Sequence, residues 1–369
     1  MQYFLLCAGE DSGDVLGESF VSAVIAAGYG ARGTGGARMQ AAGLDSVCEY
    51  ETLPVSGFGD VLPHYFRLRR AYAALCDALT APECVGFIAI DYPGFNMRLC
   101  ALAKRLGKRV LYVAPPQVWA WKSSRARKLQ GVPLAVLFDF EGDAFARLGC
   151  EARRLRHPFA ISSERPDDSR DQILLLPGSR KSQAVRNLKA YIRVVRDSGR
   201  RVTVVAARKS LVPVLERVLL QSFGGNVPAC VSVTVAPESV ADRRHLYGSV
   251  VGALVAPGTA TLELALSACP QVVLTVPDPL TYIMGSLLVK ASHFAMPNIL
   301  LSCKAVPEFI CAPWALRRTV PQIRQALESM EKGAAKTAAT SIANNLGAIV
   351  AGGKSAAELL GEFFQGNAH

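Results

Sequence analysis

Short hydrophobic runs alternate along the chain with longer segments whose apolar positions recur at helical spacing. Apolar runs of about four to eight residues are typical of strands buried on both faces, and a helical segment after each run is typical of a βα unit. A first series comprises Tyr3–Ala8, Val85–Ile90, Val110–Val113 and Ala135–Phe138, with helical patterns over Val15–Ala27 and Met97–Leu106. A second series comprises Ile173–Leu176, Val202–Ala206, Val231–Val235, Val250–Val255 and Gln271–Leu274. The pattern predicts an α/β fold with two parallel sheets.

Two α/β domains are therefore expected, joined by a polar linker. The segment Ser162–Asp171 separates the two series and contains a proline and several acidic residues, so we place the hinge there. Beyond about residue 320 the chain is rich in Ala, Lys and Glu and has no strand pattern, which predicts a helical tail. We assign residues 1–165 and 341–369 to the first Rossmann-like domain, and 166–340 to the second.

Composition and charge narrow the class of protein. Of the 369 residues, 50% are hydrophobic and 19% are charged, which is typical of a folded globular chain. The excess of 41 Lys and Arg over 30 Asp and Glu gives a net charge of +11, and nine of the positive residues lie in 92–138, which has no acidic residue. A basic surface favours a phosphate-bearing partner, which leaves nucleic acid, an anionic membrane and an anionic small substrate open.

The sequence also disfavours several other kinds of protein and site. The ten cysteines are never closer than eight residues, so they form no CxxC pair and are expected to be buried thiols of a reducing cytoplasm. The run Tyr3–Ala8 lacks a cationic lead-in and is followed by acidic residues, so an ordinary signal peptide is not expected. Pro257 interrupts the least polar later stretch, so no membrane span is expected. The histidines show no HExxH spacing, and no metal or cofactor is expected.

Three predicted strands end in turns rich in small residues, namely Gly9–Asp14, Pro177–Arg180 and Pro257–Glu263. Ligands of open α/β sheets bind beyond the carboxyl ends of strands, and small residues there let backbone N–H groups approach an anion. Each turn alone is also a common strand-to-helix connection. Three of them in one chain, with Arg180 placed to hold a phosphate, favour a nucleotide or phosphosugar site.

Two further short sequence segments are weaker evidence for a ligand-binding site. The segment Gly28–Gly33 matches GxGxxG, but it follows a helical pattern where the dinucleotide fingerprint must follow a strand, so we reject it. The string Asp139–Glu141 is expected to begin a helix.

An isolated carboxylate and an aromatic segment leave alternatives open. Asp91 follows the strand pattern Val85–Ile90 and precedes Pro93, so it is either a helix cap or a general base. Trp119 lies in Val118–Lys122, within the basic region, and either packs in a core or faces a sugar or lipid.

The helical segment Val61–Leu79 mixes apolar and cationic residues. Its notable positions are Tyr65, Phe66, Arg67, Leu68, Arg69 and Arg70. This composition suits contact with an anionic lipid surface, whereas an ordinary amphipathic helix facing the core remains the alternative.

Together these motifs resemble the lipid-A-disaccharide synthase family, inverting glycosyltransferases of the GT-B type with two Rossmann-like domains facing a cleft. The resemblance covers most of the chain and rests on Gly9–Asp14, Gly35–Gln40, Ile90–Asn96, Val118–Trp121, His157–Pro158, Leu176–Arg180, Gly258–Glu263, Pro297–Asn298 and Val306–Glu308. It implies transfer of 2,3-diacylglucosamine from UDP to 2,3-diacylglucosamine 1-phosphate, forming the lipid A disaccharide 1-phosphate and UDP.

The resemblance also implies residue roles and partners. Asp91 matches the general base, Arg180 with Ser179 would stabilise the departing diphosphate, and the remaining binding residues would be Glu10, Ser12, Gly258, Thr259, Glu263 and Asn298. The expected location is the cytoplasm, peripherally on the anionic inner face of the inner membrane. A homodimer with exchanged C-terminal helices is implied as well, and no nucleic acid.

The chain departs from the family pattern at Gly94, Asp139, Arg156, Gln183 and Pro257. Gly94 stands where the family often has a second aspartate. Two alternatives differ from the family function: another UDP-sugar enzyme, such as an epimerase or a soluble-acceptor transferase, and a non-catalytic membrane or nucleic-acid binder that uses residues 92–138. The second alternative leaves the three strand-end turns unexplained.

Overall fold

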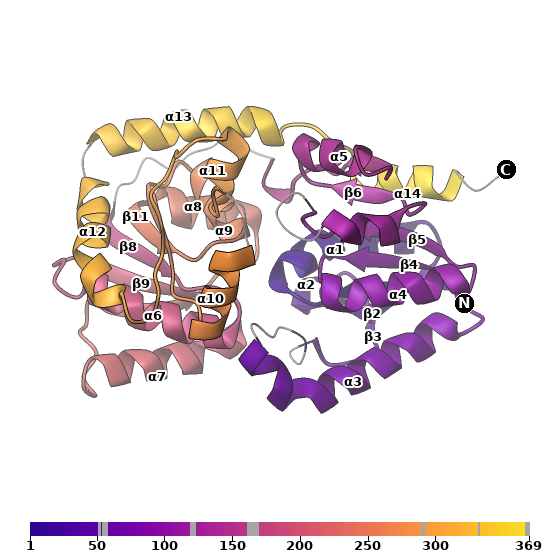
Figure 1. Cartoon of the computed structure of the whole chain (residues 1–369), viewed down its shortest axis with the longest axis horizontal. Helices are drawn as coiled ribbons and strands as arrows, with labels where there is room; N and C mark the ends of the chain where they lie inside the picture. The colour runs from indigo at the N-terminus through magenta and orange to yellow at the C-terminus, as the bar shows by residue number, and fades with distance from the viewer. Residues whose placement is uncertain are drawn as a thin grey trace. The chain divides into compact units, whose positions relative to one another are not determined.

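The computed structural model describes residues 1–50, 53, 58–118, 123–160, 170–288, 292–330 and 333–365. It divides into two units, each an α/β fold around one parallel sheet (Figure 1). The first unit contains the described parts of Met1–Val55, Gly59–Ala160 and Val350–His369, and the second is built on Ile161–Ile349. The predicted fold class is confirmed.

The first unit holds a seven-stranded parallel sheet in the part of the chain that is described, in the order β3-β2-β1-β4-β5-β6-β7. Its strands are β1 (Tyr3–Ala8), β2 (Gly30–Thr34), β3 (Asp45–Ser46), β4 (Cys84–Ile90), β5 (Arg109–Val113), β6 (Leu134–Val136) and β7 (Ala152–Arg154). Its helices are α1 (Asp11–Ala26), α2 (Ala37–Ala41), α3 (Phe58–Thr80), α4 (Pro93–Arg105), α5 (Asp139–Ala146) and α14 (Ala356–Gln365).

Alternate residues of the strands divide the first core into two layers. Leu5 and Cys7 of β1 point to the face covered by α3, α4 and α5. Phe4 and Leu6 point to the face covered by α1 and α14. Because both faces are buried, β1 is apolar along its whole length, and this is why its pattern was recognisable.

The second unit holds a six-stranded parallel sheet within its described residues, in the order β10-β9-β8-β11-β12-β13. Its strands are β8 (Arg170–Leu176), β9 (Arg201–Ala206), β10 (Val231–Val235), β11 (Val250–Val255), β12 (Gln271–Thr275) and β13 (Glu308–Ile310). Its helices are α6 (Lys181–Val195), α7 (Val212–Ser222), α8 (Val240–Gly248), α9 (Thr259–Leu266), α10 (Pro279–Leu288), α11 (Met296–Leu301), α12 (Leu316–Ser329) and α13 (Gly333–Val350).

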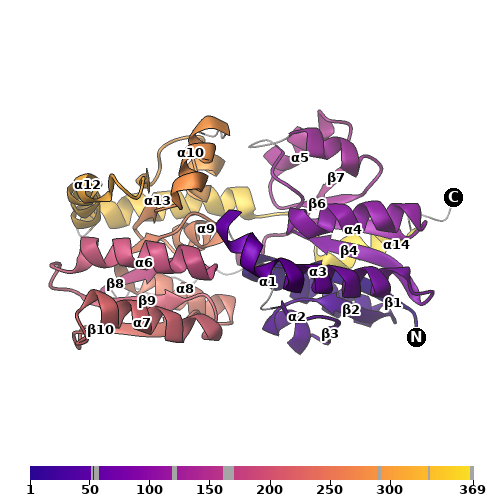
Figure 2. The same ribbon diagram turned by 60° about the horizontal axis from the view of Figure 1, so that its bottom comes forward.

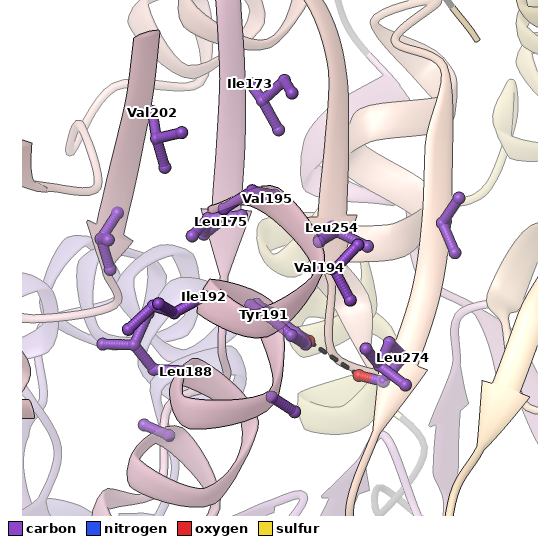
Figure 3. Close-up of a cluster of buried hydrophobic side chains, with 14 of the residues drawn as sticks. Ile173, Leu175, Leu188, Tyr191, Ile192, Val194, Val195, Val202, Leu254 and Leu274 are labelled. Carbon is purple, nitrogen blue, oxygen red and sulfur yellow. Dashed lines mark hydrogen bonds between the residues drawn. The ribbon is translucent and has the colours of Figure 1, made fainter. Parts of the chain in front are cut away.

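One face of this second sheet is covered by α6, α7 and α12 (Figures 1 and 2). The core there is aliphatic, and Figure 3 shows Leu188, Tyr191 and Val195 of α6 packed against the strands. Tyr191 is fully buried, and its hydroxyl donates to the carbonyl of Leu274 at 2.7 Å. The one polar group of that ring therefore has a partner, as a buried hydroxyl requires.

Several segments differ from the sequence-based expectation. β2, β3, β7 and β13 had no strand prediction, and the rejected segment Gly28–Gly33 leads from α1 into β2. Of the predicted linker, residues 162–169 lie outside the described residues, and Arg170 and Asp171 already belong to β8. The proposed domain boundary after residue 340 falls within α13, which the contacts assign to the second unit as far as Ile349.

The described C-terminal part of the chain is helical, as its composition predicts. α12 and α13 belong to the second unit, and α14 packs on the first. Within the described residues, no helix is long and apolar enough to cross a membrane.

Candidate active site

Each sheet has a point at which the strand order reverses, and the predicted turns lie there. In the first unit β1 and β4 are neighbours, followed by Gly9–Asp14 and by Asp91. In the second unit β8 and β11 are neighbours, followed by Pro177–Arg180 and by Pro257–Gly258. Connections leave in opposite directions at such a point, which opens the crevice where α/β proteins bind ligands.

Asp91 stands in a strained turn at the end of β4. Asp91 and Tyr92 both have φ of +48°, a left-handed conformation that costs a non-glycine residue about 1–3 kcal/mol. The N-cap of α4 is Tyr92, so Asp91 does not have the helix-cap role that the sequence left open. Its carboxylate instead accepts a hydrogen bond from the Ser12 hydroxyl, with Oγ and Oδ2 3.3 Å apart. Two of the predicted site residues are thereby brought together.

Asn96 and Tyr112 hold the strained turn in place. The Asn96 side chain is fully buried, and its Nδ2 donates to the carbonyls of Cys7, Ile90 and Asp91 at 3.0, 3.1 and 2.7 Å. The Tyr112 hydroxyl donates to the same Asp91 carbonyl at 3.0 Å. One amide therefore ties the ends of β1 and β4 to the turn that carries the carboxylate.

The Tyr92 ring fixes the other side of this turn. Its hydroxyl donates to the carbonyl of Leu53 at 2.9 Å, and its ring lies against Gly9. A Cβ at Gly9 would approach the ring to 2.4 Å, so glycine is required after β1. The small residue expected to admit an anion therefore has a packing role in the structure.

The start of α1 is held by a buried carboxylate. Asp14 is 7% exposed, and it accepts hydrogen bonds from the backbone N–H groups of Arg38 and Met39, each at 3.1 Å. Burial raises the pKa of Asp14 in spite of these bonds. Glu10, the N-cap of α1, and Ser12 in its first turn are half-buried at the same sheet edge.

A second carboxyl group lies beyond β6, at the carboxyl edge of the same sheet. Glu141 is at the third position of α5, which begins at Asp139 as predicted. Its Oε2 accepts from the N–H groups of Leu137 and Phe138 at 3.1 and 3.2 Å. Burial raises the pKa of Glu141 to about 7, and the charge of Asp91 adds to the rise. The sequence pattern predicts only a helix start here and no functional role for Glu141.

The second unit presents a cationic turn after β8. Ser179 and Arg180 are half-buried, and Arg180 is the N-cap of α6. Asn187 of α6 is fully buried, donates to the carbonyl of Pro177 at 2.9 Å and accepts from the N–H of Val276 at 2.9 Å. The turn is therefore anchored by an asparagine, as the turn of Asp91 is.

The turn after β11 is open to solvent at its tip. Gly258 and Thr259 are exposed, and Gly258 has φ of +146°, which favours glycine. Glu263, one turn into α9, is only 14% exposed and pairs with the buried Arg243, with Oε2 and Nε 3.6 Å apart. An ion pair therefore orients Glu263 toward α8.

The structure gives Asn298 a different role from the predicted ligand contact. Asn298 is fully buried, its Nδ2 donates to the carbonyl of Val306 at 2.9 Å, and its Oδ1 accepts from the N–H of Val306 at 2.8 Å. Both ends of its amide are thus used within the protein. Asn298 positions the segment before β13. Glu308, the first residue of β13, accepts from the N–H groups of Phe294 and Ala295.

The basic helix α3 combines the two predicted alternatives, because one of its faces is exposed and the other packs in the core. Tyr65 and Phe66 are 51% and 78% exposed, beside the exposed Arg67, Arg69 and Arg70. Leu68, predicted to contact lipid, is instead buried in a cluster with Leu53 and Tyr92. The correction follows from helical geometry, because Leu68, Ala71 and Leu75 share the face that packs on the first unit. Trp119, Trp121 and Lys122 lie outside the described residues.

Among the described residues, no group of three or more His, Cys, Asp or Glu side chains is placed to hold a metal ion. The cysteines described are all free thiols, and several of them, including Cys7, Cys84 and Cys100, belong to the core of the first unit. Burial raises the pKa of Cys100 to about 12, which keeps this thiol protonated and unreactive at neutral pH.

Comparison with solved structures establishes the fold. Arabidopsis thaliana UGT89C1 complexed with UDP superposes with a TM-score of 0.62 at 11% identity, covering 98% of this chain and 100% of that one. Anabaena Alr3699/HepE in complex with UDP and glucose superposes with a TM-score of 0.55 at 12% identity, covering 99% of both chains. At such low identity the likeness is one of fold, here that of GT-B glycosyltransferases.

Sequence comparison establishes the family. The lipid-A-disaccharide synthase of Gluconobacter oxydans is 32% identical over 355 residues, covering 89% of this chain and 82% of the relative. The lipid-A-disaccharide synthase of Geobacter metallireducens is 29% identical over 344 residues, covering 88% of this chain and 87% of the relative. The family model described as lipid-A-disaccharide synthetase matches residues 4–349. The chain therefore belongs to the lipid-A-disaccharide synthetase family of hexosyltransferases.

Proposed function

We propose that the protein transfers 2,3-diacylglucosamine from UDP to the 6-hydroxyl of 2,3-diacylglucosamine 1-phosphate, with inversion, in a reaction for which Asp91 is the general base. The observation that carries the proposal is the strained, doubly anchored turn of Asp91 at the switch point of the first sheet. Strain of this kind is retained where a side chain has to be held in one direction for function. Membership of the family supports the substrate class.

The proposed chemistry is a single displacement. The Asp91 carboxylate accepts the proton of the acceptor hydroxyl while that oxygen forms a bond to the anomeric carbon of the donor. The bond from this carbon to the diphosphate oxygen breaks on the opposite side, and its electron pair leaves with UDP. Attack from the back inverts the anomeric centre. Ser12, which donates to Asp91, would orient the carboxylate for this step.

The donor diphosphate is assigned to the second unit. Arg180 and Ser179 stand at the start of α6, and Gly258 and Thr259 stand at the start of α9. A cation and the N-terminal N–H groups of a helix stabilise the charge that develops on a departing diphosphate. Glu263, held by Arg243, is assigned to the nucleoside.

The acyl chains of both substrates require contact with a lipid phase. The exposed Tyr65 and Phe66 on α3, with three arginines beside them, suit an anionic membrane surface. We expect Tyr65→Ser with Phe66→Ser to weaken binding to vesicles that contain anionic lipid, at unchanged thermal stability. Leu68 is left in place in this experiment because it belongs to the core.

The direct test is an assay with UDP-2,3-diacylglucosamine and the monosaccharide phosphate in detergent micelles, in which disaccharide 1-phosphate is measured and its anomeric configuration is read by NMR. We expect a β(1→6) product, and Asp91→Asn to abolish transfer while calorimetry still detects UDP binding. The matched control is Asp45→Asn, an exposed carboxylate paired with Arg32 in the same unit. Transfer by Asp91→Asn at the parent rate would disprove the assignment of the base.

The donor assignment has a test of its own. Arg180→Ala removes one charged donor, and the rate loss expected from such a removal is about 10²–10³-fold. The control is Arg193→Ala, an exposed arginine in the last turn of the same helix. Equal activity of the two variants would exclude Arg180 from the donor site.

A further inference from the structure

One edge of the second sheet differs from the other sheet edges of the protein. The strand at this edge, β10, has β9 as its one neighbour among the described residues (Figure 2). It is five residues long, and its sequence Val-Ser-Val-Thr-Val contains no charge, proline or glycine. The other edge strands are two or three residues long, and each carries a charge, at Asp45, Arg153 or Glu308. Charges and short length protect a sheet edge from pairing with another chain, and β10 has neither protection.

The backbone of β10 directs part of its hydrogen-bonding groups outward. The Val202 N–H donates to the carbonyl of Cys230, and the Ala236 N–H donates to the carbonyl of Ala206, each at 2.8 Å. Because the backbone groups of successive residues point to opposite sides of a strand, the even-numbered residues between these two bonds face β9. The odd-numbered residues, with Val233 at the centre, therefore direct their N–H and C=O groups away from the sheet.

The side chains of β10 continue two different layers of the second unit. On the face covered by α7, Val233 is half-buried against the aliphatic core, and Val235 is 38% exposed. On the opposite face a row of polar side chains crosses three strands. Gln172 Nε2 donates to Thr203 Oγ1 at 2.6 Å, and the hydroxyls of Thr203 and Ser232 are 3.0 Å apart. Both the apolar layer and the polar row therefore extend to the exposed edge of the sheet.

The sequence of β10 is complementary to itself. When two copies of the strand are placed antiparallel around a two-fold axis at Val233, Val231 faces Val235 of the second copy, and Ser232 faces its Thr234. Each pair matches in polarity, valine with valine and hydroxyl with hydroxyl, and such cross-strand pairs stabilise a sheet. The backbone fits as well, because the outward groups of Val233 can exchange two hydrogen bonds with the same residue of the second copy. An unrelated extended peptide would make no use of this symmetry.

We propose that two copies of the protein associate through β10, antiparallel and centred on Val233, so that their two six-stranded sheets form one continuous sheet. Pro228 and Pro237 flank the strand and limit the pairing to the residues between them, because proline has no N–H to donate. The Val231 N–H donates to the carbonyl of Pro228 at 2.9 Å, so the residues around Val233 carry the contact. This interface differs from an exchange of C-terminal helices, and its test needs no sugar substrate.

Charges at Val233 test the two-fold axis. Val233→Lys and Val233→Glu each place two like charges opposite one another, so either variant should weaken self-association of the full-length protein, measured by sedimentation equilibrium, at least about tenfold. An equimolar mixture of the two variants should restore association, because opposite charges then face each other. Mixing does not rescue a variant that has lost its fold, and thermal unfolding of each variant checks this directly. The control is Leu280→Lys, at an exposed position on α10, which follows β12, four strands away from β10.

A cysteine substitution tests the register. In the arrangement centred on Val233, Ala236 of one copy faces the exposed Cys230 of the other, in a pair whose Cα atoms lie about 4.5 Å apart, within disulfide range. We expect Ala236→Cys to give a disulfide-linked dimer on oxidation with diamide, and peptide mass spectrometry to show residue 230 joined to residue 236. Ala236→Cys combined with Cys230→Ser should give no such dimer.

Four results would overturn the inference. The first is a protein that sediments as a monomer at every accessible concentration. The second is self-association that Val233→Lys leaves unchanged, which places the contact elsewhere, for example at the C-terminal helices. The third is a mixture of the two charge variants that associates as weakly as each variant alone. The fourth is the absence of a cross-link between residues 230 and 236 in the Ala236→Cys protein.

Discussion

The anchor of the Asp91 turn can be removed by one substitution, Asn96→Ala. The side chain is fully buried and donates to three carbonyls, those of Cys7, Ile90 and Asp91. Because an amide has only two N–H donors, Asn96→Ala removes the stabilisation of about two hydrogen bonds, at about 1 kcal/mol each. With about 1–2 kcal/mol for the cavity left behind, we expect the free energy of unfolding to fall by about 2–4 kcal/mol.

The effect on activity should exceed the effect on stability. Two adjacent left-handed residues store about 2–6 kcal/mol of strain, which can relax once Asn96 no longer holds the Asp91 carbonyl. Relaxation moves the carboxylate away from Ser12, and a displacement of about 1 Å in a reacting group costs about 10²-fold in rate. We therefore expect kcat per folded molecule to fall about 10²-fold, with the KM for the UDP donor unchanged.

Asn187→Ala is the matched control. Asn187 is equally buried and loses three hydrogen bonds, to the carbonyl of Pro177 and from the Val276 N–H and the Thr275 hydroxyl, but it anchors the donor-side turn. It should cost similar stability and raise the KM for the UDP donor instead of lowering kcat. Steady-state kinetics at a temperature at which urea titration shows both variants folded compares the two. If Asn96→Ala turns over at the parent rate, the strained turn has no part in catalysis.

Three further perturbations follow from the structure. Gly94→Asp places a carboxylate at the second position of α4, where a Cβ meets no atom within 4 Å. A negative charge near a helix N-terminus is stabilising, so the free energy of unfolding measured in urea should rise by about 0.5–1 kcal/mol. A fall in that free energy would mean that the position is crowded. The pKa of Glu141 is raised to about 7, so its contribution to stability is present below about pH 4.3 and is lost as pH rises through 7. Glu141→Gln should therefore gain stability over the parent between pH 5 and 8, and parallel curves would contradict the raised pKa. Phe363→Ala should cost about 3–5 kcal/mol in thermal unfolding, because this ring packs on Phe4 and against the Arg109 guanidinium; a cost below 1 kcal/mol would show that α14 does not cover that core.

The sequence predicts the apolar central strands and misses three short strands at sheet edges, for a physical reason. β1, β4 and β11 are covered by helices on both faces and flanked by strands, so each is an unbroken apolar run, and β8 is one from Ile173 onward. β3, β7 and β13 stand at sheet edges and are only two or three residues long. Edge strands are partly solvated and need no apolar run, so pattern alone does not distinguish them from loops.

The candidate site, like the fold, could be predicted only in part. The strand-end turns could be located because small residues after a buried run are visible in the sequence, and Asp91 because it directly follows such a run. What could not be read is which side chains face a ligand and which are used by the protein. Asn298 and Leu68 both had predicted external contacts, and both are buried with partners of their own.

A signal for the anchoring asparagines was nevertheless present. Asn96 precedes Leu99 and Ala103 on the buried face of α4, and Asn187 lies among the buried residues of α6. An amide on the apolar face of a helix is costly unless its hydrogen bonds are made, and the strand-end carbonyls just before the helix are the groups within its reach. In a βα unit of this kind, a core-facing asparagine early in the helix therefore marks the preceding turn as one whose backbone has to be fixed. In both units that turn carries the charged residue assigned to chemistry, Asp91 in one and Arg180 in the other.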